Sequence, residues 1–250
     1  MTGWLAIAGL GPGDEALITP EVTQALDQAS DLIGYAPYVR RVGGRAGLVR
    51  HETDNREELD RARHALALAA AGRQVVVVSS GDPGVFAMAS AVFDAVESGP
   101  AHWRALEIRV LPGVTAMLAA AARAGAPLGH DFCAINLSDN LKPWDLIARR
   151  LRLAAEADFA MALYNPRSAS RPDGFARTLA LLREVCAPDR LIVFARAVST
   201  PEERIRVVEL RDATPEMADM RTVVLIGSSA TRLIARDGAP YVFTPRSVPA

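Results

Sequence analysis

Short apolar runs alternate along the chain with longer segments that have the period of a helix. Residues 74–79 contain four consecutive valines, and residues 4–10 form a similar run. A run without polar alternation is typical of a strand covered on both faces, so the valine segment is expected at the centre of a sheet. Further strands are expected at residues 107–111, 131–137, 159–164, 191–195 and 222–226. The pattern predicts an α/β fold with a largely parallel core.

Capping residues mark where the first helices begin and end. Thr19 followed by Pro20 predicts a helix start, because threonine caps a first turn and proline suits its first position. Asp54 with Glu57 three residues later has the pattern of a capping box, and Gly72 is expected to end that second helix.

The middle of the chain contains the expected domain boundary. An alanine-rich helix is expected at residues 114–124, and a segment with glycine and proline follows at residues 125–129. Because both residue types interrupt regular structure, we place the boundary near residue 126. The prediction is an N-terminal α/β domain, residues 1–126, and a C-terminal α/β domain, residues 127–250.

Composition and charge exclude several classes of partner. Half of the 250 residues are apolar and the formal net charge is -1, so the chain lacks the basic surface typical of nucleic-acid binding. Any anionic partner must be bound by local arginines. Lys142 is the only lysine and lies outside a Gly-Lys-Ser/Thr motif, which argues against a phosphate-binding P-loop and leaves one candidate for lysine chemistry.

Cysteine, histidine and hydropathy patterns give no sign of a metal, a disulfide or a membrane span. The two cysteines lie far apart in apolar segments, and His51, His64, His102 and His130 lack metal-ligand spacing. No apolar stretch approaches the roughly 20 residues of a membrane helix, and the first residues have no basic leader. We therefore expect a cytoplasmic protein without a metal centre.

The first expected strand runs into a glycine-rich loop, residues 9–14. A dinucleotide-binding turn holds pyrophosphate through backbone N–H groups, but Pro12 has no N–H and Asp14 would repel phosphate. A cationic ligand without phosphates, such as S-adenosylmethionine, suits this loop better, because glycines allow the backbone to approach closely. Asp31 occupies the place of a ribose-binding acid about 20 residues on, so a nicotinamide-dependent oxidoreductase is the alternative.

Four further loops follow expected strands, at residues 80–83, 112–116, 164–168 and 226–229. Ligands collect at the carboxyl ends of strands in open α/β sheets, so loops of both halves are expected to converge on one crevice. Each loop alone also fits a simple tight turn.

In this order, the motifs resemble those of the tetrapyrrole (corrin and porphyrin) methylases. The matching segments are residues 9–14 with 17–19, Gly81-Asp82-Pro83 with Phe86, residues 112–116, and residues 224–227. Residues 34–39, and residues 162–168 followed by Arg171, are similar to the branch that methylates C17 of precorrin-3B and contracts its ring. Ser80 departs from several relatives with another glycine before Gly81, although its hydroxyl offers a replacement donor.

The resemblance implies two α/β domains with S-adenosylmethionine in the cleft between them, a small-molecule tetrapyrrole substrate and a homodimer. The implied cofactor contacts, on the matching positions, are Pro12, Ser80, Gly81, Asp82, Thr115, Ala116, Asn165, Ala197 and Gly227. Methylation of another precorrin, of diphthine or of ribosomal RNA is an alternative within the family, and a tetrapyrrole carrier without catalysis is a further one.

The implied substrate carries many carboxylates, which arginines bind in bidentate pairs. The candidate substrate residues are Arg40, Arg41, Arg167 and Arg171, with Tyr38 and Tyr164 against the face of the macrocycle. A surface role is the alternative for each arginine, and core packing for each tyrosine. Ring contraction implies a general base, and Asp82, Asp14 and Tyr35 are the candidates; the alternative for Asp82 is cofactor or backbone binding.

Overall fold

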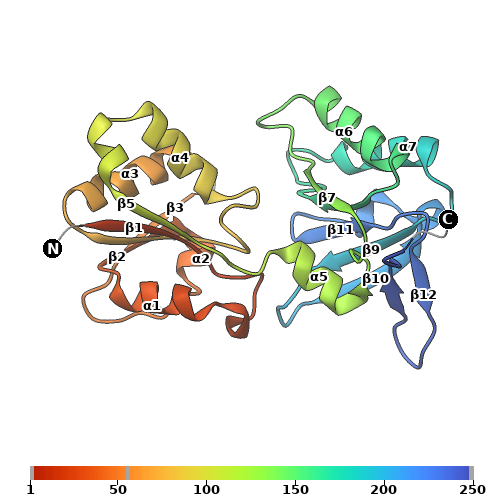
Figure 1. Ribbon diagram of the computed structural model, residues 1–250, viewed down its shortest axis with the longest axis horizontal. Helices are drawn as coiled ribbons and strands as arrows, with labels where there is room; N and C mark the ends of the chain where they lie inside the picture. Colours follow the sequence, from red (N-terminus) through yellow and green to blue (C-terminus); the bar gives the residue numbers. More distant parts are fainter. Residues whose placement is uncertain (1–2, 55–56, 248–250) are drawn as a thin grey trace. The chain divides into compact units, whose positions relative to one another are not determined.

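The computed structural model describes residues 3–54 and 57–247, and the chain forms two compact units, Met1–Thr115 (unit 1) and Ala116–Ala250 (unit 2) (Figure 1). The division lies about ten residues before the boundary predicted near residue 126. The α/β fold class is confirmed in each unit.

Unit 1 is a parallel sheet with helices on both faces. Its strands are β1 (Trp4–Gly9), β2 (Asp31–Tyr35), β3 (Val49–Thr53), β4 (Gln74–Ser79) and β5 (Glu107–Leu111), in the parallel order β3-β2-β4-β1-β5. Its helices are α1 (Pro20–Gln28), α2 (Ala36–Val39), α3 (Glu58–Ala70) and α4 (Met88–Ser98), with 3-10 turns at Glu15–Leu17 and Ala101–Ala105. In Figure 1, α1 lies on one face of the sheet and α3 and α4 lie on the other.

The valine run of β4 lies at the centre of this sheet, as predicted. Val75 and Val77 pack in a cluster with residues of α3 and α4, whereas Val76 and Val78 pack with residues of α1. Successive side chains of a strand point to opposite faces, so a strand between two helical layers must be apolar at every position. The uniformly apolar sequence of β4 therefore reflects its position between two layers of helices.

The helix ends agree with the predictions at two positions and differ at one. Thr19 accepts a hydrogen bond from the Val22 N–H at 3.3 Å at the start of α1, and Gly72 adopts a φ of 86° after α3. The predicted capping box is wrong, because α3 begins at Glu58 with Glu57 as its N-cap residue. The carbonyl of Asp54, four residues before the helix, instead accepts the Glu57 N–H. Residues 55 and 56 lie outside the described residues.

Unit 2 contains a mixed sheet, which differs from the predicted parallel core. Its strands are β7 (Phe132–Asn136), β8 (Ala160–Tyr164), β9 (Leu191–Arg196), β10 (Arg204–Glu209) and β11 (Thr222–Ile226), in the order β10-β9-β11-β8-β7. β7 and β8 run parallel, whereas β11 runs antiparallel to both β8 and β9, and β10 runs antiparallel to β9. A small sheet joins β12 (Arg232–Ile234), β13 (Tyr241–Phe243) and β6 (Gly125–Ala126).

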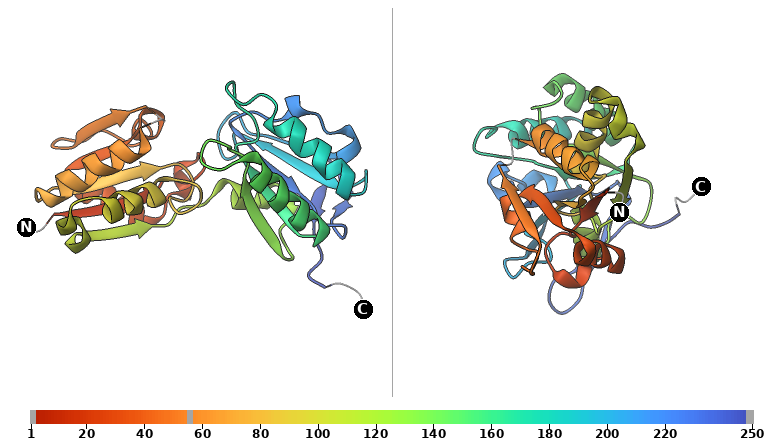
Figure 2. Two further views of the ribbon diagram at one scale, coloured as in Figure 1. Left: turned by 90° about the horizontal axis from the view of Figure 1, so that it is seen from above. Right: turned by 90° about the vertical axis from the view of Figure 1, so that its left-hand side faces the viewer.

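Helices cover both faces of the mixed sheet. The helices are α5 (Ala116–Ala124), α6 (Trp144–Glu156) and α7 (Gly174–Val185), with 3-10 turns at Leu210–Asp212 and Pro215–Met217. α6 and α7 pack side by side on one face (Figures 1 and 2). On the other face, Ala120 and Ala124 of α5 pack with Val223 and Leu225 of β11, which explains why α5 belongs to unit 2. The glycine and proline segment after α5 is therefore the short strand β6 followed by a turn, both within unit 2.

Across residues 3–54 and 57–247, none of the helices combines the length and the apolar character that crossing a membrane requires.

Candidate functional site

Three loops interlock at the carboxyl edge of the unit 1 sheet, after β1, β4 and β5. Gly11 and Gly81 exchange backbone hydrogen bonds, with N···O distances of 3.2 and 2.9 Å. A Cβ atom on Gly9 would lie 2.6 Å from the Gly81 carbonyl oxygen, and one on Gly113 would overlap the same oxygen. The loops therefore pack main chain against main chain, at a distance that only glycine permits.

Asp82 braces two of these loops. Its Oδ1 accepts the N–H of Gly84 at 2.8 Å, and its Oδ2 accepts the N–H of Gly113 at 3.1 Å. The carboxylate thus joins the loop after β4 to the loop after β5. These contacts agree with the alternative role of backbone binding, and proton abstraction by Asp82 stays a prediction.

The two arginines of unit 1 that the sequence predicts as substrate ligands, Arg40 and Arg41, have different contacts. Arg41 donates hydrogen bonds to the carbonyls of Leu10 at 2.6 Å, Gly11 at 3.1 Å and Gly13 at 3.2 Å. Burial lowers the pKa of Arg41, and the three carbonyls supply the acceptors that its guanidinium loses from water. Arg40 is exposed and pairs with Glu52 at 2.9 Å. Arg41 therefore shapes the first glycine loop, and these contacts give no support to a substrate role for either arginine.

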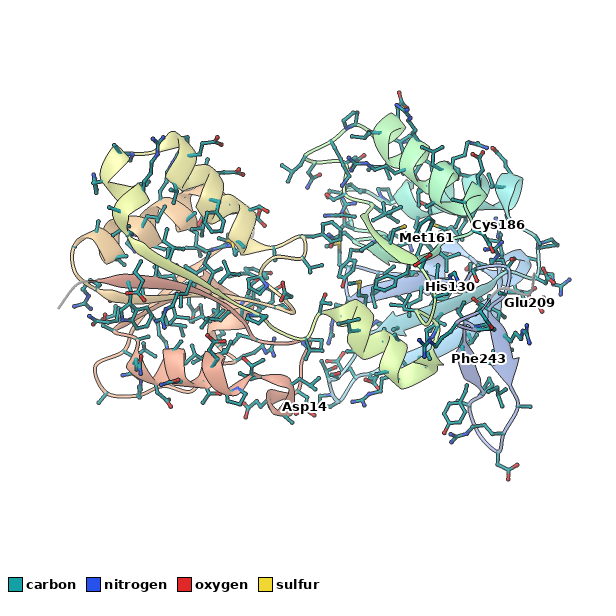
Figure 3. The ribbon with its side chains drawn as sticks, in the orientation of Figure 1. Asp14, His130, Met161, Cys186, Glu209 and Phe243 are labelled. Atoms are coloured by element: carbon teal, nitrogen blue, oxygen red, sulfur yellow. The ribbon has the colours of Figure 1, made fainter. Side chains whose placement is uncertain are left out.

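Two tyrosines and Asp14 lie next to the loops. The rings of Tyr35 and Tyr38 pack edge to face with centroids 5.3 Å apart, and the Tyr38 hydroxyl forms a hydrogen bond with the Ser80 side chain. Burial is the main cause that raises the pKa of Tyr38. Asp14 lies on the exposed turn that leads into α1 (Figure 3), and its Oδ1 caps a 3-10 turn by accepting the Ala16 N–H at 2.9 Å.

Asp31, the acid that a nicotinamide enzyme would need, lies at the wrong end of its strand. It is the first residue of β2, at the amino edge of the parallel sheet, whereas the glycine loops follow the carboxyl ends. Its buried carboxylate accepts hydrogen bonds from Arg73 Nε and the Ser30 hydroxyl, both at 2.7 Å, and lies 2.9 Å from His51 Nε2. Burial alone would raise the pKa of Asp31, but these hydrogen bonds outweigh it and lower the pKa. The structure therefore removes the main support for the nicotinamide alternative.

A second set of predicted residues meets in unit 2. β7, β8 and β9 end at one edge of the mixed sheet, because β11 runs antiparallel to both β8 and β9. The Tyr164 hydroxyl, at the end of β8, accepts the Met117 N–H at 3.0 Å, which places the start of α5, with Ala116, at this edge. Asn165 follows β8 and donates its Nδ2 to Asn136 Oδ1 at 3.1 Å. We call this the carboxyl edge of unit 2.

Two residues of this edge have an unusual backbone. The φ angles of Asn165 and Ala197 are 52° and 48°, in the left-handed region that asparagine tolerates but alanine rarely adopts. Such strain persists where the surroundings impose it, and it is concentrated at functional sites. Both residues are predicted cofactor contacts.

The structure contradicts the placement of Gly227 with these residues. Gly227 donates its N–H to the carbonyl of Leu191, the first residue of β9, at 2.9 Å, so it lies at the opposite edge of the sheet. Gly227 lies at this edge because β11 runs antiparallel to β8 and β9. The residue pattern of a strand does not reveal its direction. The segment that leads into β11 occupies the carboxyl edge instead: Arg221 accepts the Ala197 N–H at 2.8 Å, and Met220 precedes it. Sequence reasoning missed this segment.

Arg171 and Arg167 follow β8 and differ in their contacts. Arg171 is almost buried and donates its Nη1 to the carbonyls of Asn165 at 3.3 Å and Leu137 at 3.5 Å, so it ties two loops together. Its Nε lies 3.9 Å from Asp139 Oδ1. In the described part of the chain, Arg167 forms no hydrogen bond and has no carboxylate within 4 Å, although Glu216 is a nearby negative charge. Arg167 is therefore the predicted arginine whose donors are not taken up by loop carbonyls or a carboxylate.

Residues 3–54 and 57–247 contain no group of three or more His, Cys, Asp or Glu side chains arranged to hold a metal ion.

The order of the loops and their glycine packing are features of a class of α/β ligand-binding proteins. Comparison with known families identifies which family of this class the chain belongs to. The family model of the tetrapyrrole (corrin/porphyrin) methylases matches residues 5–214, and the chain belongs to this family. The family prediction from the sequence is confirmed.

Individual relatives cover almost the whole chain. The precorrin-3B C(17)-methyltransferase of Sinorhizobium sp is 55% identical over 247 residues, which are 98% of this chain and 97% of the relative. A probable cobalt-factor III C(17)-methyltransferase of Salmonella typhimurium is 37% identical over 243 residues, or 97% of this chain and 98% of the relative. The crystal structure of the methyltransferase CobJ matches with a TM-score of 0.93 at 69% identity, over 97% of this chain and 100% of that one.

A more distant structure shares the fold. Uroporphyrin-III C-methyl transferase from Thermus thermophilus, complexed with S-adenosyl homocysteine, matches with a TM-score of 0.69 at 24% identity, over 90% of this chain and 97% of that one.

Proposed function

We propose that this protein transfers a methyl group from S-adenosylmethionine to C17 of precorrin-3B and contracts the macrocycle to precorrin-4, in cobalamin biosynthesis. The observation that carries the proposal is the 55% identity, over nearly all of both chains, to a relative named for this reaction. The loop geometry of unit 1 supports the cofactor on separate grounds.

The residues at the glycine loops fit a sulfonium cofactor. Gly9, Gly81 and Gly113 pack main chain against main chain, and turns of this kind can bring backbone close to a ligand. Asp82 and Asp14 add negative charge, which attracts a sulfonium and repels a phosphate. We retain eight of the predicted cofactor contacts: Pro12, Ser80, Gly81, Asp82 and Thr115 in unit 1, and Ala116, Asn165 and Ala197 in unit 2. We add Met220 and Arg221 in place of Gly227.

The chemistry assigns the protein mainly a positioning role. The bound cofactor supplies an electrophilic methyl group, and an electron-rich carbon of the substrate supplies the electron pair. Holding the two partners in line contributes effective molarities of about 10⁵ to 10⁸ M in favourable cases. Rigid main-chain loops suit this task, because the hydrogen bonds of Asp82 and Arg41 fix their shape. Deprotonation during ring contraction falls to Asp14, Tyr35 or Asp82, as predicted from the sequence.

We further propose a homodimer in the cytoplasm, as the family resemblance implies. Cys133 and Cys186 are both free thiols, which suits a reducing compartment.

The test is anaerobic incubation with precorrin-3B and methyl-labelled S-adenosylmethionine. We expect a product that gains one labelled methyl group and has the absorption of a contracted macrocycle. Cobalt-factor III is the competing substrate, because the Salmonella typhimurium relative is named for it. Labelling of cobalt-factor III but not precorrin-3B would replace the proposed substrate, and labelling of neither would refute the proposed reaction. Titration with NADH, monitored by fluorescence, should show no binding.

A further inference from the structure

The loop between β7 and α6 holds the only lysine of the chain. Residues 137–143 follow the end of β7 and so belong to the carboxyl edge of unit 2 (Figure 1). The loop is anchored at its start, because the Leu137 N–H donates to the Tyr164 carbonyl at 2.9 Å and the Leu137 carbonyl accepts from Arg171. Leu141 is 92% exposed, and Lys142 follows it directly.

Lys142 is a cation without a counter-charge. In the described residues, neither Lys142 nor Arg150 of α6 has a carboxylate within 4 Å, whereas Arg171 lies 3.9 Å from Asp139 and Arg196 lies 2.8 Å from Asp219. Burial, and then the positive charge of Arg150, lower the pKa of Lys142. Lys142 is partly buried and Arg150 is exposed, and two neighbouring cations repel each other less when an anion binds between them.

The arginines predicted to bind substrate carboxylates are already engaged in other hydrogen bonds. Arg41 and Arg171 donate to backbone carbonyls of the loops. Among the described residues that follow β7 and β8, Lys142 and Arg167 keep free donors, and Arg150 of α6 lies near Lys142. A lysine ammonium binds carboxylate as a compact point charge and needs no bidentate geometry.

We propose that Lys142, with Arg150 beside it, binds a peripheral carboxylate of the tetrapyrrole substrate. The exposed Leu141 offers an adjacent apolar contact to the macrocycle. This inference rests on the proposed function and names a substrate contact for it. Lys142 acts in binding and takes no part in methyl transfer, so its loss affects the KM for the tetrapyrrole and leaves cofactor binding unchanged.

The first experiment compares steady-state kinetics of variants with precorrin-3B. Lys142→Met keeps the length of the side chain and removes the charge, and we expect it to raise KM about tenfold, the effect of one charge-assisted hydrogen bond. Lys142→Arg should restore most of the affinity. Arg206→Met removes the same charge from the middle of β10, at an exposed position away from the carboxyl edge, and should leave KM unchanged. Calorimetry should give the same S-adenosylmethionine Kd for all variants.

An unchanged KM in Lys142→Met would overturn the proposal, as would an equal rise in Arg206→Met. Failure of the wild-type protein to methylate precorrin-3B is a different outcome, because it contradicts the proposed function first. A second experiment therefore tests Lys142 without turnover.

The second experiment uses the wild-type protein and a water-soluble carbodiimide. The carbodiimide activates a carboxylate of bound tetrapyrrole, and the neutral Lys142 amine displaces the resulting urea to form an amide. Precorrin-3B and uroporphyrin III, a stable tetrapyrrole with carboxylate side chains, serve as separate probes. We expect macrocycle absorbance on the peptide that contains Lys142, and none in Lys142→Arg, whose guanidinium does not form the amide. Absence of the adduct with both probes would overturn the proposal.

Discussion

The packing of the glycine loops predicts that one added methyl group at Gly113 disrupts unit 1. The Cβ of Gly113→Ala would lie 2.8 Å from the Gly9 carbonyl oxygen, which is 0.6 Å short of the 3.4 Å at which ordinary contact begins, and it would lie closer still to the Gly81 oxygen. Both oxygens are buried backbone atoms, one at the end of β1 and one in the loop after β4, so neither can rotate away as a side chain would.

The expected magnitude follows from these contacts. Overfilling a packed site costs about 1–3 kcal/mol. Moving the loops apart also weakens the hydrogen bonds between Gly11 and Gly81 and between Asp82 and Gly113, each of which contributes about 0.5–1.5 kcal/mol. We expect the free energy of unfolding of unit 1 to fall by about 2–4 kcal/mol, and the affinity for S-adenosylmethionine to fall at least about tenfold because the loops lose their register.

Urea unfolding and calorimetry test this prediction. Trp4 and Trp103 report on unit 1, and a Trp144→Phe background removes the signal of unit 2 so that each transition is fitted separately. Gly43→Ala is the matched control, because a Cβ there would meet no atom within 4 Å. If Gly113→Ala unfolds at the same urea concentration as Gly43→Ala and binds the cofactor equally well, the reasoning about main-chain packing is refuted.

Two further predictions concern the edges of the sheets. Asp31→Asn should lower stability at neutral pH by about 1–3 kcal/mol. The pKa of Asp31 in the folded protein lies below the unfolded value of 3.8, so its contribution to stability is present above pH 3.8 and is lost as the pH falls through the folded pKa. The urea midpoint should therefore fall less steeply between pH 7 and pH 3 in the variant than in the wild type. Identical slopes would contradict this prediction. Gly227→Ala would place a methyl group 2.6 Å from the Thr231 hydroxyl and should lower the melting temperature without changing the S-adenosylmethionine Kd, whereas Asn165→Ala should weaken cofactor binding. A larger loss of affinity in Gly227→Ala than in Asn165→Ala would reinstate the sequence-based assignment.

Much of unit 1 was predictable because its signals are local. Four valines in a row require a covered central strand, and a glycine at each of three strand ends indicates close backbone approach. β2 and β3 were missed. β3 is an edge strand with the polar sequence Val-Arg-His-Glu-Thr, and its pairing with β2 supplies the regular structure that its own residues do not indicate.

Unit 2 was harder to predict because its organisation depends on strand direction. An apolar strand reads the same whether it runs parallel or antiparallel, so the reversal of β11 moved Gly227 to the far edge and brought Met220 and Arg221 to the near one. The roles of the arginines were hidden for a related reason. The sequence shows that Arg41 and Arg171 carry five donors each, but only the folded loops show which carbonyls accept from them.

The main-chain construction of the unit 1 loops has a consequence for redesign. Glycine backbone sets the shape of the cluster, whereas Pro12 and Ser80 add side chains to it, and that of Ser80 is hydrogen-bonded to Tyr38. Exchanging these two residues for smaller ones should widen the space at the proposed sulfonium site while the glycine backbone keeps its shape. The scaffold therefore lends itself to variants that accept donors with alkyl groups bulkier than methyl.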